Sequence, residues 1–356
     1  MQGETARTTA NGRAAGRTVV TGGAGLIGSA VVRQLNLEGT DEIVVVDRLG
    51  TSEKWRHLVP LRFADYLDAE EFFPLIAARP DAFGEIATVF HLGACSSTTE
   101  RDASYLVANN VRRSQEIATW AFARGARFVY ASSAATYGAR ECEMREDLDP
   151  HALRPLNMYG YSKHLFDQWM RREGLLERAV GLKYFNVYGP NEDHKGEMRS
   201  VVAKAYEQIR ARGTIELFKS YRDGIAHGEQ TRDFLYVKDA VAITSFLART
   251  PQAGGIYNVG SGTDRTWNDL AHAVFDALEL PARIEYIEMP EVLRGKYQYR
   301  TVAAVERLRA AGWAQPATAL EDAVADYVKN YLVSGTVLGN ESGAASSPVP
   351  TFSATR

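Results

Sequence analysis

The stretch TGGAGLIG at residues 21–28 decides the fold. It follows an apolar run at residues 17–21 and opens an amphipathic segment at residues 27–37. In this strand-turn-helix context Gly22 permits a tight turn, Gly25 lets the backbone approach a pyrophosphate, and Gly28 lets the helix pack closely on the sheet. Asp47 ends the next apolar run, 47 minus 28 or 19 residues after Gly28. This spacing predicts a dinucleotide site that includes Gly22, Gly25, Gly28 and Asp47.

Further apolar runs place this motif in a larger sheet. They lie at residues 42–47, 88–92, 128–132 and 180–184, and helical patterns separate them, as at residues 105–123. Strands that are apolar almost throughout are expected where helices cover both faces of a parallel sheet. The pattern therefore predicts an α/β fold with a Rossmann-like, doubly wound parallel sheet.

The alternation breaks after about residue 185, which indicates two regions. We expect a nucleotide-binding domain at residues 17–185 and, mainly at residues 186–333, a smaller C-terminal α/β domain for the substrate. A strand at 255–259 can rejoin the main sheet, so segments at about 230–262 are expected to return to the first domain. The second region should include a helix entered through a capping box at 266–269 and a last helix at 320–332. The polar ends, a leader at residues 1–16 and a tail at 334–356, are predicted to be disordered.

Composition excludes several classes of protein. The chain has 356 residues, with 41 basic and 44 acidic side chains and a net charge of −3, which argues against a nucleic-acid partner. Cys95 and Cys142 are too few for a disulfide framework or a four-thiolate metal site, and they fit a reducing compartment. No apolar run approaches the roughly 18 to 20 residues that span a bilayer, and no secretory signal opens the chain. We expect a cytoplasmic protein with no membrane partner and no metal.

The residues around Asp47 bear on the choice of cofactor. An acidic residue at this position accepts hydrogen bonds from ribose hydroxyls and favours NAD. Arg48 follows it directly and Lys54 lies on the next loop, and either cation can hold a 2′-phosphate. The alternative is that both are solvated loop charges. The sequence favours NADP and leaves NAD possible.

A second motif, YGYSK at residues 159–163, begins another amphipathic helix. Tyr159 and Lys163 are four residues apart (163 minus 159) and share a helix face. An adjacent ammonium should lower the pKa of the phenol, which suits a general base near neutral pH. Ser133 follows the strand at 128–132, so its hydroxyl should lie at the carboxyl edge of the sheet, where it can hydrogen-bond a reacting oxygen.

Together these motifs resemble the extended short-chain dehydrogenase/reductase superfamily, over roughly residues 19–332. The resemblance implies a sugar-nucleotide enzyme and leaves dehydration, 4-epimerisation, decarboxylation and reduction open. The dehydratases of the superfamily carry an Asp-Glu pair just after the hydroxyl residue. Ala134 and Ala135 stand there in this chain and cannot transfer protons, which argues against dehydration.

Separate blocks in one order narrow the resemblance to the ADP-L-glycero-D-manno-heptose 6-epimerase family. The blocks are LGACSSTTE at 92–100, SAATYG at 133–138, KYFNVYGP at 183–190, HKG at 194–196, RDF at 232–234, GKYQ at 295–298 and LRAAGW at 308–313. The resemblance implies interconversion of ADP-D-glycero-β-D-manno-heptose and ADP-L-glycero-β-D-manno-heptose, in the cytosolic route to lipopolysaccharide core heptose. It implies transient oxidation at C6 with tightly bound NADP and a hydride return that is not stereospecific.

The resemblance also implies roles for individual residues. Tyr159 and Lys195 would be the two acid/base groups, with Lys163 holding the cofactor and Ser133 assisting. A lysine base needs its pKa lowered by burial or by a neighbouring cation, and Lys163 is a candidate for that cation. The implied cofactor contacts are Leu26, Ile27, Asp47, Arg48, Lys54, Leu92, Gly93, Ala94, Cys95, Ser96, Asn109, Lys163 and Val187. The implied substrate contacts are Asn186, Glu197, Lys204, Phe218, Lys219, Ser220, Tyr221, Arg232 and Tyr297.

The chain departs from the family pattern at the nucleotide end of the substrate site. Glu197 stands where a serine is common, Lys204 where a histidine is common, and residues 218–221 replace a more acidic stretch. The loop at 222–230 is also longer. These differences bear on the nucleotide preference and leave the acid/base residues intact.

Two other functions are consistent with these motifs. One is another sugar-nucleotide epimerase, such as a UDP-hexose 4-epimerase. The other is a nucleotide-sensing protein that binds the cofactor without turnover, which the presence of all four acid/base and supporting residues disfavours. The resemblance further implies a homo-oligomer, specifically a pentamer, with a small-molecule sugar nucleotide as the substrate.

Overall fold

The computed structural model describes residues 16–141, 144–295 and 297–340. A seven-stranded, fully parallel sheet forms its centre, in the order β11-β6-β5-β4-β1-β2-β3. This is the doubly wound arrangement that the glycine motif and the apolar runs predict, with the order reversing between β1 and β4. The strands are β1 (Arg17–Thr21), β2 (Ile43–Asp47), β3 (Asp65–Asp68), β4 (Ile86–His91), β5 (Arg127–Ser133), β6 (Ala179–Tyr184) and β11 (Gly255–Val259).

Helices cover both faces of the sheet, which explains why its central strands are mostly apolar. Val20 and Val45 pack into the core that contains α1 (Leu26–Leu37) and α7 (Val237–Arg249). Val19 and Val44, one position earlier on the same strands, pack into a separate core on the opposite face. That second core is covered by α2 (Ala69–Ala78), α4 (Arg113–Ala123) and α5 (Met158–Arg172).

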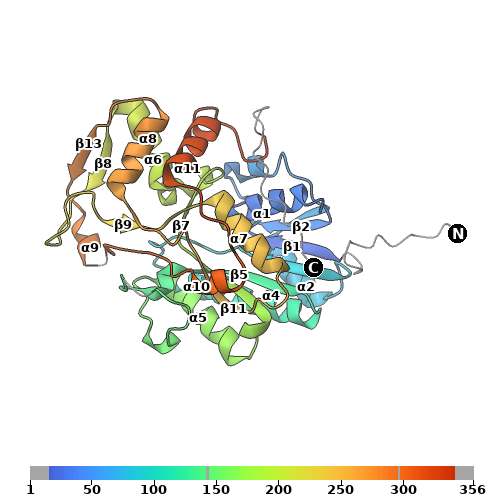
Figure 1. The fold of residues 1–356 in the computed structure, drawn as a ribbon. Helices are drawn as coiled ribbons and strands as arrows, with labels where there is room; N and C mark the ends of the chain where they lie inside the picture. The colour runs from blue at the N-terminus through green and yellow to red at the C-terminus, as the bar shows by residue number, and fades with distance from the viewer. Residues whose placement is uncertain (1–15, 142–143, 296, 341–356) are drawn as a thin grey trace.

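A smaller α/β region stands to one side of the sheet (Figure 1). It contains α6 (Val201–Arg212), α8 (Trp267–Ala277) and the parallel pair β8 (Ile215–Phe218) and β13 (Ile284–Ile287). The predicted capping box opens α8, where the Thr266 and Asp269 side chains each bond the other's backbone amide. Two short pairs connect the regions: β7 (Asn186–Tyr188) with β10 (Phe234–Tyr236), and β9 (Thr231–Arg232) with β12 (Arg265–Thr266).

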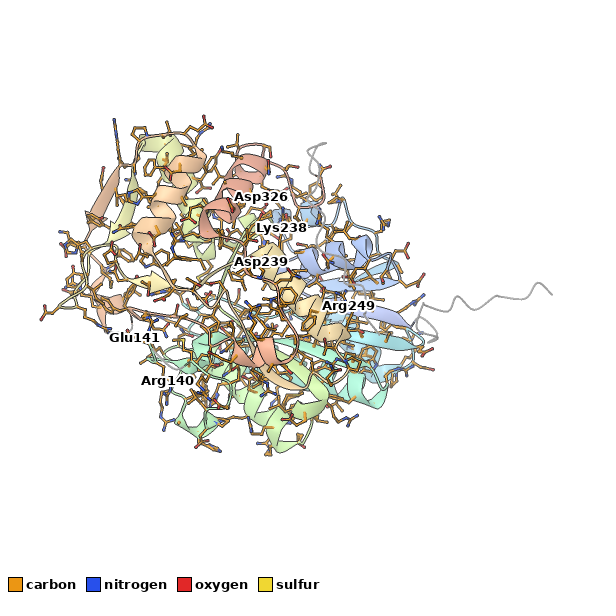
Figure 2. The ribbon with its side chains drawn as sticks, viewed as in Figure 1. Arg140, Glu141, Lys238, Asp239, Arg249 and Asp326 are labelled. Carbon is orange, nitrogen blue, oxygen red and sulfur yellow. The ribbon has the colours of Figure 1, made fainter. Side chains whose placement is uncertain are left out.

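The two regions interleave along the chain. After α6 and β8, the chain returns through α7 and β11 to the main sheet, which the strand at 255–259 rejoins as predicted, by pairing with β6. The last long helix, α11 (Leu320–Tyr327), is attached to α7 by an ion pair of 2.7 Å between Lys238 and Asp326 (Figure 2). Because α11 also packs on α8, it connects the smaller region to α7 and the main sheet.

The remaining elements are short. Two of them, η2 (Val107–Arg112) and η7 (Val328–Leu332), are π-helical turns that continue α3 and α11, where single helices were predicted at 105–123 and 320–332. The other short elements are η1 (Glu53–His57), α3 (Ala103–Leu106), η3 (Ala134–Tyr137), η4 (Pro150–Ala152), η5 (Leu176–Arg178), η6 (Asp193–Met198), α9 (Glu291–Arg294) and α10 (Glu306–Ala310).

The packed chain extends beyond the boundary expected at residue 333. Leu338 is buried in the core next to α1 and α7, and its amide donates to Asn191 Oδ1 at 3.0 Å. The prediction of a disordered tail is therefore wrong for residues 334–340, because one leucine in a polar stretch is enough to anchor it. The rest of that tail, the leader up to residue 15, Cys142 and residue 296 lie outside the described residues. Within the described ranges, no helix combines the length and the apolar character needed to cross a bilayer.

Candidate active site

The loop between β1 and α1 requires bare backbone at two positions. Gly22 has a φ of +69°, and a Cβ there would lie 2.7 Å from the backbone nitrogen of Gly93. A Cβ on Gly28 would lie 1.9 Å from the carbonyl oxygen of Gly22, so the first turn of α1 can approach the loop only with glycine. Gly25 is the N-cap residue and supplies no side-chain acceptor to the first amides of α1. These donors and the close backbone approach fit the pyrophosphate of a dinucleotide.

Asp47, at the carboxyl end of β2, already accepts three hydrogen bonds from the chain. Its Oδ2 accepts from the amide of Ala24 at 2.8 Å. Its Oδ1 accepts from the amide of Arg48 and from Lys54 Nζ, both at 2.7 Å. Asp47 thus fixes the glycine loop and holds a lysine at the position where a ribose would bind.

Arg48 extends from the same strand end toward a second cavity, of about 220 Å³. Its guanidinium donates to Asn109 Oδ1 at 2.8 Å and to Glu70 Oε1 at 2.5 Å. Arg113 lines the same cavity and lies over the ring of Phe73 at 4.6 Å. This pocket therefore combines two guanidinium groups with the predicted contacts Cys95 and Asn109, and the sequence interpretation did not include Arg113.

Ser133 and Tyr159 meet where β5 ends and α5 begins. Ser133 caps the short helix η3 by accepting from the amide of Ala135 at 3.1 Å. Burial raises the pKa of the Tyr159 phenol, and a hydrogen bond with the Ser133 side chain opposes part of that rise. The two hydroxyl residues therefore lie together at the carboxyl edge of the sheet.

Lys163 lies one turn further along α5 and is almost completely buried. Its Nζ donates to the carbonyl of Ala131 at 2.8 Å, and burial lowers its pKa to about 8 while Asp167 opposes that change. We expected this ammonium to lower the pKa of Tyr159, and in the structure the pKa of Tyr159 is raised. That expectation is wrong for this structure, because burial raises the pKa of the phenol and Lys163 is not among the groups that shift it.

Lys195 lies on the short helix η6 and lines a cavity together with Tyr159 and Lys163. Burial lowers its pKa below the ordinary value of 10.5, and Glu192 opposes part of the change. The sequence interpretation considered Lys163 as a cation that lowers this pKa, but Lys163 is not among the groups that do so. Gly196, with a φ of +53°, turns the chain directly after Lys195.

One cavity of about 360 Å³ brings these groups together at the carboxyl edge of the sheet. It contains all four predicted acid/base and supporting residues, one predicted substrate contact, and most predicted cofactor contacts. The predicted residues that line it are Gly22, Gly25, Leu26, Ile27, Gly28, Asp47, Lys54, Leu92, Gly93, Ala94, Ser96, Ser133, Tyr159, Lys163, Asn186, Val187 and Lys195.

The other predicted substrate residues do not line this cavity. Arg232 lies against two aromatic rings, 4.9 Å from the centroid of Tyr297 and 5.5 Å from that of Trp267. Glu197 projects into solvent with 96% of its side chain exposed and pairs with Lys204 at 3.3 Å. Lys219 and Tyr221 belong to a separate surface cluster around Glu288. Lys219 Nζ lies 2.7 Å from Glu288 Oε1, and the Tyr221 hydroxyl donates to Oε2 of the same carboxylate. Phe218 and Ser220 flank this cluster at the end of β8.

Sequence reasoning left out several residues that line the main cavity. His194 is the most polar of them: burial lowers its pKa to about 4, and its Nδ1 is buried without a hydrogen-bond partner among the described residues. Its position beside Lys195 in the HKG block was the available signal. The others are Ala131, Ser132, Tyr184, Phe185 and Met198, to which the sequence interpretation gave no role.

A model of the NAD dependent epimerase/dehydratase family matches residues 18–260, and the chain belongs to this family. It is 52% identical over 316 residues to the ADP-L-glycero-D-manno-heptose-6-epimerase of Nitratidesulfovibrio vulgaris (strain DP4), covering 88% of this chain and 97% of that protein. It is 42% identical over 324 residues to the protein of the same name from Fusobacterium nucleatum subsp. nucleatum, covering 88% of this chain and 97% of that protein. Within its family, the chain thus groups with the ADP-L-glycero-D-manno-heptose-6-epimerases.

Solved structures agree with this placement. The crystal structure of the Helicobacter pylori ADP-L-glycero-D-manno-heptose-6-epimerase superposes with a TM-score of 0.75 and 26% sequence identity, covering 88% of this chain and 95% of that chain. The UDP-glucose 4-epimerase of Thermus thermophilus, solved with NAD, superposes with a TM-score of 0.69 and 25% identity, covering 88% of this chain and 97% of that chain. The site therefore belongs to an epimerase fold that takes a nicotinamide cofactor.

Proposed function

We propose that this chain interconverts ADP-D-glycero-β-D-manno-heptose and ADP-L-glycero-β-D-manno-heptose by inverting C6. The observation that carries the proposal is the arrangement of Tyr159 and Lys195 in one cavity with the glycine loop. They extend from different elements, α5 and η6. Inversion at an exocyclic carbon requires the oxygen of that carbon to be presented in two orientations, and two separate acid/base groups serve both.

The two groups are poised in opposite senses. The raised pKa of Tyr159 keeps its phenol protonated, and the lowered pKa of Lys195 makes loss of a proton easier. A bound nicotinamide would supply reversible hydride exchange at C6. As the hydride leaves, one group takes the proton of the C6 hydroxyl. After the resulting aldehyde has turned, the other group gives a proton to its oxygen, so the substrate undergoes no net redox change.

The remaining residues of the site have supporting roles in this proposal. Ser133 orients Tyr159 and the reacting oxygen, and Lys163 holds the nicotinamide ribose beside Ala131. Arg232 suits the substrate diphosphate because its guanidinium offers a planar fork and is already held between aromatic rings. Asn186, at the start of β7 and on the wall of the cavity, is the proposed sugar contact.

The proposed cofactor is NADP. Three donors of the chain already engage Asp47, so its carboxylate is less available to ribose hydroxyls, while Lys54 and Arg48 supply positive charge at the same end. NAD remains the alternative. Cytoplasmic location and a homo-oligomeric, pentameric assembly are predictions carried over from the resemblance, and sedimentation velocity of the purified protein would test the assembly.

Proton NMR of purified protein with ADP-D-glycero-D-manno-heptose, without added cofactor, tests the function. We expect both C6 epimers to appear and reach equilibrium. UDP-glucose in a parallel sample addresses the 4-epimerase alternative, for which UDP-galactose would appear instead. Cofactor release on denaturation with no turnover of either sugar nucleotide would contradict the proposal and favour a binding protein.

A further inference from the structure

His57 lies at the end of η1 and is completely buried. Its Nδ1 lies 2.7 Å from the carbonyl oxygen of Ala24 in the glycine loop. Its Nε2 lies 2.6 Å from Oδ1 of Asp193, the residue that begins η6 two positions before Lys195. One imidazole therefore joins the cofactor loop to the segment that carries the proposed lysine acid/base.

The chemistry of its two neighbours determines the protons on this ring. A backbone carbonyl only accepts, so Nδ1 must carry a hydrogen. Although burial opposes it, the hydrogen bond with His57 holds the pKa of Asp193 below its ordinary value, which favours a carboxylate that accepts from Nε2. The ring of His57 is thus held at both nitrogens, at one by the glycine loop and at the other by the first residue of η6.

His194 completes a group of three potential metal ligands with His57 and Asp193. Two ligands of one tetrahedral ion, each about 2.0 Å from it, stand about 3.3 Å apart. The 2.6 Å between Nε2 and Oδ1 is shorter and fits a shared hydrogen. The buried ring of His57 therefore acts as a connection between segments.

The surroundings of η6 explain why this connection matters. Before the helix, Asn191 bonds Ser29 at 2.9 Å and Glu192 accepts from the amide and hydroxyl of Ser200. Near the end of η6, Lys204 Nζ donates to the backbone carbonyl of Glu197 at the protein surface. Among the described residues, the side-chain hydrogen bond that connects η6 to the glycine loop is the one between Asp193 and His57, whose other ring nitrogen contacts the Ala24 carbonyl.

We propose that His57 is a positioning residue that sets the distance between Lys195 and the cofactor loop through its bond to Asp193. The inference rests on the proposed function, because it assigns Lys195 an acid/base role. Lys54 lies on the same turn as His57 and bonds Asp47. The helix η1 therefore connects Asp47, the proposed ribose contact, with the segment that carries Lys195.

Two substitutions separate the two bonds of His57. In His57→Gln the side-chain amide reaches as far as Nε2 and can still donate to Asp193, whereas His57→Asn can donate only to Ala24. Asp193→Ala removes the same bond from a side chain that is 51% exposed, so it should fold even if the histidine variants do not. Because Asp193→Ala and His57→Asn remove the same connection, their effects should be far from additive when combined.

The experiment measures kcat and KM together with the pKa of Lys195, obtained by competitive acetylation at a series of pH values, with Lys238 as an internal reference. In His57→Asn and Asp193→Ala we expect kcat to fall at least about 10-fold with little change in KM. We also expect the pKa of Lys195 to rise toward 10.5 as it gains solvent. His57→Gln should recover most of both properties.

The proposal is overturned if His57→Asn and Asp193→Ala keep the wild-type kcat and Lys195 pKa. It is also overturned if all three variants, including His57→Gln, lose activity in parallel with thermal stability, which would indicate a merely structural role. A wild-type enzyme that does not epimerise the heptose, combined with a shifted Lys195 pKa in the variants, would contradict the proposed function and leave the positioning role supported.

Discussion

Lys54 Nζ lies 2.7 Å from Asp47 Oδ1, at the carboxyl end of the second strand of the sheet. The carboxylate that would accept from a ribose in an NAD site is therefore paired with a cation of its own chain. A 2′-phosphate would bring two negative charges to a position where Lys54 and Arg48 are already present.

The double variant Arg48→Ala, Lys54→Ala should lose affinity for NADP and largely keep its affinity for NAD. Charge-assisted bonds of about 1.5 to 3 kcal/mol correspond to a loss of roughly 10- to 100-fold for NADP. Titration calorimetry with both dinucleotides measures the ratio. Arg56→Ala, an exposed arginine on the same η1 turn, is the matched control. An unchanged NADP to NAD ratio in the double variant would contradict the assignment.

Gly28→Ala should disrupt cofactor binding by moving the helix away from the loop. A Cβ at Gly28 would lie 1.9 Å from the Gly22 carbonyl, and backbone cannot yield as a flexible side chain does. We expect the free energy of unfolding to fall by about 2 kcal/mol or more and bound cofactor to be lost. Urea unfolding and the absorbance of released cofactor measure both. Gly295→Ala has no heavy atom within 4 Å of the new Cβ and should behave as wild type; equal behaviour of the two variants would refute this reading.

His91 should make the protein less stable in acid. It is buried between Thr21 Oγ1 and Ser114 Oγ, each 2.8 Å from a ring nitrogen, and burial lowers its pKa to about 3. The unfolded chain binds a proton here below about pH 6.5 and the folded chain does not, so this stabilisation is present above pH 6.5 and is lost as the pH falls toward 3.

The comparison of wild type with His91→Asn isolates this effect from that of the carboxylates. Between pH 6 and pH 4, wild type should lose up to about 1.4 kcal/mol more per pH unit than the variant, although the variant is less stable at pH 7. Urea unfolding at three pH values gives the slopes. Parallel slopes would show that His91 does not titrate between the folded and unfolded states as its burial implies.

Arg232 should contribute to substrate affinity more than to the chemical step. Because the guanidinium lies against the Trp267 and Tyr297 rings, Arg232→Lys removes both the fork and the contact with the rings. We expect KM for the sugar nucleotide to rise about 10-fold or more, with kcat changed less than about 3-fold. Arg212→Ala, at the exposed end of α6, controls for loss of surface charge. A fall in kcat at constant KM would instead place Arg232 at the reacting centre.

The sequence predicts the central strands well because burial on both faces demands apolar residues at each position. Strand β3 was not predicted, since its residues Asp65–Asp68 form a partly exposed edge where acidic side chains are tolerated. The buried Leu338 was missed for the opposite reason, because one apolar residue in a polar stretch carries no periodicity.

Gly22, Gly28, Tyr159 and Lys163, which the sequence proposed for the site, do line the cavity, and each belongs to a short local motif: the loop between β1 and α1 for the glycines, and one turn of α5 for Tyr159 and Lys163. The bond between His57 and Asp193 joins residues 136 positions apart, and no local pattern indicates it. The pKa of Tyr159 was predicted in the wrong direction because sequence spacing shows that Lys163 is near and does not show how strongly the cavity desolvates the phenol.

The rate of C6 inversion in Lys195→Met and Tyr159→Phe, followed by proton NMR on ADP-D-glycero-D-manno-heptose, tests the two-base account most directly. Each variant should be slowed by at least about 100-fold, the usual contribution of a general acid or base, while retaining its cofactor. If Lys195→Met inverted C6 at the wild-type rate, the account would be contradicted, because Tyr159 alone would then serve both orientations of the C6 oxygen.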